Sequence, residues 1–100
     1  MSVQAAFLFV APNVEKQKHH ALIEMEGMTL KIAGAKTYKE AVDVAKQLVA
    51  EGVTCLELCA GFGNEGVAEV AKAVGPKIAV GVVRFDFHPG FGFKSGDRMF

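Results

Sequence analysis

Strand-like and helix-like segments alternate along the whole chain, and this alternation limits the possible fold more than any other feature of the sequence. Residues 3–11 form a near-continuous apolar run, which is typical of a strand covered on both faces. Residues 28–35 alternate apolar with polar side chains, as a half-exposed or edge strand does. Residues 53–59 and 77–87 supply a third and a fourth strand. Strands that alternate with helices favour a mainly parallel sheet.

The segments between these strands carry helix signals. Thr37 with Glu40 three residues later forms a capping box, and one apolar stripe follows it: Ala41, Val42, Ala45, Leu48 and Val49. Residues 65–74 predict a second helix, closed by Gly75 and Pro76. Residues 14–25, polar first and apolar later, predict a further short helix. We therefore expect an α/β fold in one small domain over residues 1–100, with the order β-(α)-β-α-β-α-β and a mainly parallel four-stranded sheet.

Composition and charge narrow the classes of partner. Eleven Lys and Arg residues balance eleven Asp and Glu residues, so the basic excess of a nucleic-acid-binding protein is absent and we expect no nucleic-acid partner. The apolar stretch 3–10 lacks a basic leader and is far shorter than the roughly 20 residues that span a bilayer. We expect no membrane partner and a cytoplasmic protein, in which Cys55 and Cys59 stay reduced and form no metal site.

Gly61, Gly63 and Gly66 spell G-x-G-x-x-G between the third strand and the helix after it, and Asp86 lies 20 positions beyond Gly66. This arrangement matches the fingerprint of dinucleotide-binding folds. Glu65 argues against a dinucleotide, because its carboxylate in the first helical turn would repel a phosphate. We interpret the loop, including Asn64, as an approach site for a smaller anion, or as a tight turn in which Gly61 and Gly63 adopt positive φ. The cofactor stays unknown.

Reactive and charged side chains accumulate at the same end of the predicted sheet. Neighbouring strands of a βαβ unit would place Glu57 opposite Arg84, as a buried ion pair near the carboxyl ends. Arg84 would then be available to clamp a carboxylate or phosphate. These residues also have a purely structural interpretation. Cys59 would be a small core residue, and Glu57 and Arg84 would form an internal ion pair. The candidates for a catalytic role are Glu57, Cys59, Asp86 and His88.

The Gly-rich and Phe-rich tail, residues 88–100, contains four glycine or proline positions that forbid a regular element. Large apolar side chains in and next to this tail need cover: Phe87, Phe91, Phe93, Met99 and Phe100. Either the tail folds back over its own domain, or these side chains pack against a neighbouring subunit. We expect a homo-oligomer that uses its last dozen residues.

Three stretches resemble a family of uncharacterised bacterial and archaeal proteins of about this length. They are "AAFLFVAP" at residues 5–12, "EGVTCLELCAGFG" at 51–63 and "GVVRFDFHPGFGFKSGD" at 81–97. The resemblance implies a stand-alone α/β domain and supplies no activity, cofactor or catalytic residue. From the residues we expect a small anionic metabolite at the carboxyl ends of strands three and four. The alternative is a non-catalytic homo-oligomeric or partner-binding module.

Overall fold

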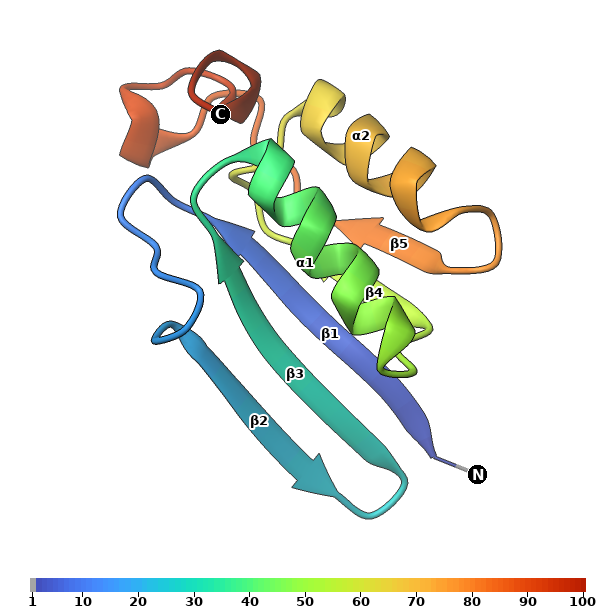
Figure 1. The fold of residues 1–100 in the computed structure, drawn as a ribbon. Helices are drawn as coiled ribbons and strands as arrows, with labels where there is room; N and C mark the ends of the chain where they lie inside the picture. Colours follow the sequence, from blue (N-terminus) through green and yellow to red (C-terminus); the bar gives the residue numbers. More distant parts are fainter. Residues whose placement is uncertain (1) are drawn as a thin grey trace.

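The computed structural model describes residues 2–100 and shows a five-stranded mixed sheet with two helices (Figure 1). The strands are β1 (Val3–Val10), β2 (His20–Met25), β3 (Met28–Ala35), β4 (Cys55–Leu58) and β5 (Ala79–Val82). The helices are α1 (Tyr38–Ala50) and α2 (Asn64–Val74). The sheet order is β2-β3-β1-β4-β5, and only β2 runs antiparallel to its neighbour. The expected α/β class is confirmed, with five strands instead of four.

The helix expected within residues 14–25 is wrong, because residues 20–25 form the edge strand β2. Ala21, Ile23 and Met25 point to one face of the sheet, and the residues between them point to the other. Gly27 at φ 84° completes a two-residue turn into β3. A period of two followed by a glycine turn is the signature of a hairpin. Because β2 pairs with β3, β3 is an internal strand and not an edge.

The two helices lie on the same face of the sheet, in front of it in Figure 1. The connections from β3 to β4 and from β4 to β5 both move across the sheet in one direction, so right-handed crossovers place both helices on one side. Thr37 begins α1 as expected, with its hydroxyl accepting from the N–H of Glu40 at 3.1 Å. The core lies between the sheet and the helices, and its largest fully buried side chains are Leu8, Leu56, Leu58, Val53 and Val70.

The C-terminal tail folds back over its own domain, at the carboxyl ends of the strands (Figure 1). Two short 3-10 helices, Pro89–Phe91 and Gly96–Arg98, shape it. Phe100 packs against the rings of Tyr38 and Phe91, with ring centroids 6.0 and 5.3 Å apart. Phe87 and Phe93 stay 70% and 68% exposed. No helix among the described residues is long and apolar enough to cross a membrane.

Candidate functional site

The start of α2, where we expected an external anion, holds a carboxylate of the chain itself. Asp97 accepts hydrogen bonds from the backbone N–H groups of Glu65 at 2.9 Å and Gly66 at 3.1 Å. Its carboxylate also accepts the hydroxyl proton of Tyr38 at 2.8 Å. The N–H of Gly63 in turn donates to the Tyr38 hydroxyl at 3.0 Å. The N–H groups of Glu65 and Gly66, in the first turn of α2, therefore donate to the folded tail, as they donate to side-chain caps in other helices.

The protonation of this cluster follows from its hydrogen bonds. Burial of the Asp97 carboxyl opposes its ionisation, but the N–H groups of Glu65 and Gly66, the Tyr38 hydroxyl and the charge of Arg84 outweigh burial and lower the pKa of Asp97. Burial is also the main reason why the pKa of Tyr38 is raised far above its usual range, and the neighbouring Asp97 raises it further. At neutral pH the pair is thus a tyrosine hydroxyl donating to an ionised carboxylate.

The glycines of the loop make room for neighbouring groups, and none of Gly61, Gly63 and Gly66 has positive φ. The expectation of positive φ at Gly61 and Gly63 is wrong. A Cβ at Gly63 would overlap the side chains of Asp97 and Ser95, and one at Gly66 would overlap the Tyr38 ring. Gly96 in the tail lies against the carbonyl of Gly61, where a Cβ would not fit. The motif therefore serves close approach of the tail and of α1 to the start of α2.

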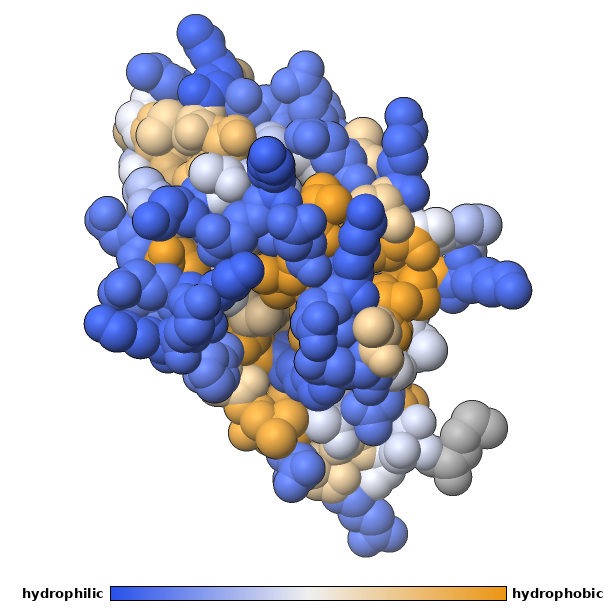
Figure 2. Space-filling model, in the orientation of Figure 1, coloured by the Kyte–Doolittle hydropathy of each residue, from blue (hydrophilic) through white to orange (hydrophobic). Residues whose placement is uncertain are grey.

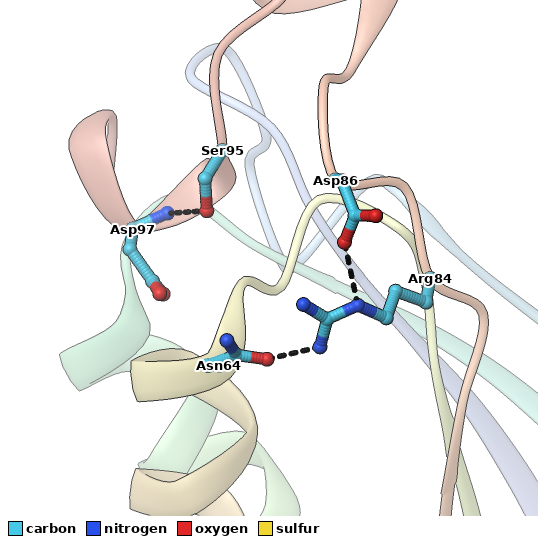
Figure 3. A network of polar contacts seen from close by, with 5 residues as sticks. All are labelled: Asn64, Arg84, Asp86, Ser95 and Asp97. Atoms are coloured by element: carbon cyan, nitrogen blue, oxygen red, sulfur yellow. Dashed lines mark hydrogen bonds and ion pairs between the residues drawn. The ribbon is translucent and has the colours of Figure 1, made fainter.

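A cleft of about 540 Å³ lies beside this cluster, at the carboxyl ends of β4 and β5. Arg84 lines it and donates from Nε to Asp86 at 2.7 Å and from Nη1 to the side-chain oxygen of Asn64 (Figure 3). The remaining lining residues come from the loop, the strand end and the tail: Gly63, Glu65, Phe85, Ser95, Asp97 and Arg98. Arg84 and Asp86 are 60% and 67% exposed, so both are open to a ligand.

The structure brings together some of the sequence-predicted site residues and not others. Gly63, Asn64, Arg84 and Asp86 line the cleft. The expected buried ion pair of Glu57 with Arg84 is wrong, since Glu57 is exposed and Arg84 pairs with Asp86. The strand register explains this, because Glu57 lies opposite Gly81 and Leu58 opposite Val82, so residue 57 faces away from the helices and Arg84 reaches toward them.

Two other catalytic candidates have structural roles. The Cys59 sulfur accepts hydrogen bonds from the N–H groups of Val10 at 3.4 Å and Gly61 at 3.3 Å, which ties β1 to the glycine loop. His88 lies in the tail, stacked on Phe91 with ring centroids 4.0 Å apart, and its Nδ1 accepts from the N–H of Gly90. Neither residue lines the cleft. Among residues 2–100, no group of three or more His, Cys, Asp or Glu side chains is placed to hold a metal ion.

Sequence reasoning missed Tyr38, Ser95, Asp97 and Arg98. Tyr38 is the first residue of α1, and its hydroxyl contacts Asp97, which lies 59 positions away in the sequence. The segment Ser95-Gly96-Asp97 did carry a local signal, because a serine followed two residues later by an acidic residue is typical of a cap. That signal indicates the short 3-10 helix and gives no information on its distant contact with α2.

A groove of about 560 Å³ lies between α1 and the β2–β3 hairpin, remote from the glycine loop. Its lining includes Leu22, Ala33, Val44 and Leu48, and Lys31 pairs with Glu51 across it at 2.8 Å. None of the sequence-predicted site residues lines this groove. The convergence of expected residues therefore selects the cleft at the strand ends.

Comparison with known proteins identifies a family and no function. A family model described as a family of unknown function (DUF6506) matches residues 3–98. Neither the curated proteins nor the solved structures contain a significant match to the chain.

Proposed function

The chain belongs to the family of unknown function DUF6506, and we propose from its geometry that it binds a small anionic metabolite in the cleft beside Arg84 and Arg98. The observation that carries this proposal is the pairing state of the two arginines. Arg84 uses Nε and Nη1 on neighbours and keeps its other terminal nitrogen for a ligand. Arg98 has no acidic side chain within ion-pair distance among residues 2–100.

Two of the three carboxylates that line the cleft, Asp86 and Asp97, are compensated, and the third, Glu65, is exposed at the start of α2. Asp97 is held by two helix N–H groups and the Tyr38 hydroxyl, and Asp86 by Arg84. Arg98 therefore supplies a cationic group beyond those already used, and a planar guanidinium suits a carboxylate or phosphate that accepts two hydrogen bonds. The ligand anion contacts side-chain donors, since Asp97 already occupies the start of α2.

The cleft also favours a ligand with an apolar or planar part. Phe85 lines it and is 48% exposed, so its ring offers a surface against which such a part can pack. Ser95 and Asn64 add short polar groups for specificity. The proposed ligand class is thus a small carboxylate or phosphate ester, bound by Arg84 and Arg98. We assign no reaction, because the cleft shows no nucleophile paired with a base.

A thermal-shift panel tests this proposal with inorganic phosphate, small mono- and dicarboxylates, sugar phosphates and nucleotides as probes. A ligand at 100 times its Kd stabilises the native state by about 2.7 kcal/mol. We expect at least one phosphate or carboxylate compound to raise the melting temperature, and Arg98→Gln and Arg84→Gln to abolish the rise. Lys46→Gln, an exposed cation on α1, is the matched control and should leave it unchanged. A panel without any stabilising anion would refute the proposal.

The second candidate function is a non-catalytic, self-associating module. The specific observation that favours it is an apolar face of the sheet on which no helix lies. In that case the arginine cleft would be ordinary polar surface, and the anion panel would give no stabilisation.

A further inference from the structure

The face of the sheet opposite the helices is almost entirely apolar. Strand register assigns side chains to this face, because paired residues on neighbouring strands point to the same side. Ile32 pairs with Phe7 on one side and Ala21 on the other, and Phe7 pairs with Glu57. The open face consists of Ala21, Ile23, Met25, Met28, Leu30, Ile32, Gly34, Val3, Ala5, Phe7, Phe9, Cys55, Glu57, Ala79 and Gly81.

The helix-bearing face has the opposite character. Figure 2 views the molecule from the helix side, where hydrophilic residues form most of the outer layer. Among these paired strand residues Glu57 is the single charged one, while Val3, Ile23 and Met25 are 51%, 43% and 56% exposed. The Phe9 ring lies against Gly34, where a Cβ would come within 2.5 Å of it. Exposed apolar patches larger than a few hundred Å² are typical of interaction sites.

We infer that the open face binds a second copy of this chain, so that two sheets pack face to face in a dimer. Strand β1 carries the first argument, because its continuous apolar run is typical of a strand buried on both faces. The single chain covers one face of β1 and leaves Phe7 and Phe9 partly exposed on the other. A second sheet about 10 Å away would supply the missing cover.

Surface area supports the same conclusion. The chain exposes 6126 Å², against about 5,500 Å² for a compact monomer of its mass of 10.7 kDa. At about 16 Å² per residue, the strands offer roughly 480 Å² of flat sheet per copy. The uneven surface of the side chains adds to this area. Two copies together offer about 960 Å², close to the threshold of about 1,000 Å² for a specific interface. The near absence of charge favours an identical apolar face over a charged partner.

Glu57 is compatible with this arrangement. It lies on β4, next to the short edge strand β5, and the residue opposite it is Gly81. Because Gly81 has no side chain, the Glu57 carboxylate can extend over β5 to the rim of the interface and remain in water. The alternative interface would use the tail, where Phe87 and Phe93 are exposed at the carboxyl ends of the strands.

Sedimentation velocity over a range of protein concentrations tests the inference. We expect a dimer for the native chain, and dissociation constants at least about tenfold higher for Ile32→Lys, at the centre of the open face, and Ile23→Lys, on its rim. Leu22→Lys is the matched control, because Leu22 is 55% exposed on the same strand but faces the helix side. It should leave the dimer intact, as should the tail variant Phe87→Ser with Phe93→Ser.

Circular dichroism verifies that each variant is folded, and Ile23→Lys keeps the test valid if Ile32→Lys does not fold, since Ile23 is already half exposed. A native chain that is monomeric at all concentrations would overturn the inference. So would a dimer that survives Ile23→Lys and dissociates in the tail variant, which would place the interface at the phenylalanines. The result of the anion panel does not depend on either outcome, because the cleft lies beside the start of α2 and not on the open face.

Discussion

The hydroxyl of Tyr38, at the first residue of α1, donates a hydrogen bond of 2.8 Å to the carboxylate of Asp97 in the tail. The same carboxylate accepts two N–H groups at the start of α2. One side chain therefore joins both helices to the C-terminal segment. This contact also explains why the loop contains glycine, since the tail approaches Gly63 so closely that a Cβ there would overlap it.

Replacing Asp97 with alanine should lower the free energy of unfolding by about 2 kcal/mol, because α2 loses its cap and the Tyr38 hydroxyl loses its acceptor. The matched control is Asp86→Ala, which removes a carboxylate from an exposed ion pair and should cost less than about 0.5 kcal/mol. Urea unfolding followed by circular dichroism measures both. Equal losses for the two variants would contradict the capping role of Asp97.

The lowered pKa of Asp97 predicts an acid-dependent stability. A carboxyl whose pKa is lower in the folded state stabilises the fold fully above its unfolded pKa of about 3.9, and that contribution is lost as the pH falls through the folded value. Asp97→Asn lacks this contribution. Unfolding free energies measured between about pH 7 and pH 3 should therefore converge for the native chain and Asp97→Asn as the pH falls. A constant difference would exclude Asp97 as the source.

Gly66→Ala should destabilise the fold by about 1–3 kcal/mol, because the new methyl group overlaps the Tyr38 ring. Gly81→Ala is the control, since nothing lies within 4 Å of a Cβ there and its φ is negative. It should change the stability by less than about 0.5 kcal/mol. If thermal unfolding ranks the two variants equally, then the glycine at position 66 is not required for close packing.

Local sequence signals predicted most of the fold and only part of the site. Thr37 and the stripe after it identified α1, because capping and periodicity act within a few residues. The helix predicted within residues 14–25 is wrong because a polar start followed by apolar residues also fits a strand, and the alternation that ends at Gly27 indicates a hairpin. The contact of Asp97 with α2 joins residues 31 and 32 positions apart, and no local pattern encodes it.

Glu57→Gln should change the free energy of unfolding by less than about 0.5 kcal/mol, because Glu57 is exposed and no ion pair within the described residues involves it. A buried pair with Arg84 would instead lose about 3–5 kcal/mol when one partner is removed. Denaturant unfolding of this one variant separates the two cases. A loss of several kcal/mol would show that Glu57 has a charged partner in solution.

NAD and NADP should not stabilise the chain, because Asp97 occupies the helix start that would hold the pyrophosphate. Calorimetric titration of the native protein with each cofactor measures this. Clear heats of binding that ADP-ribose competes away would mean that the tail leaves the glycine loop in solution.

Isothermal titration calorimetry with the most stabilising phosphate or carboxylate compound of the panel tests the proposed function most directly. The account predicts a saturable signal with one site per chain, lost in both Arg84→Gln and Arg98→Gln and retained in Lys46→Gln. A signal that persists unchanged in both arginine variants, or no binding by any of these compounds, would contradict an anion site in the cleft between the glycine loop and the tail.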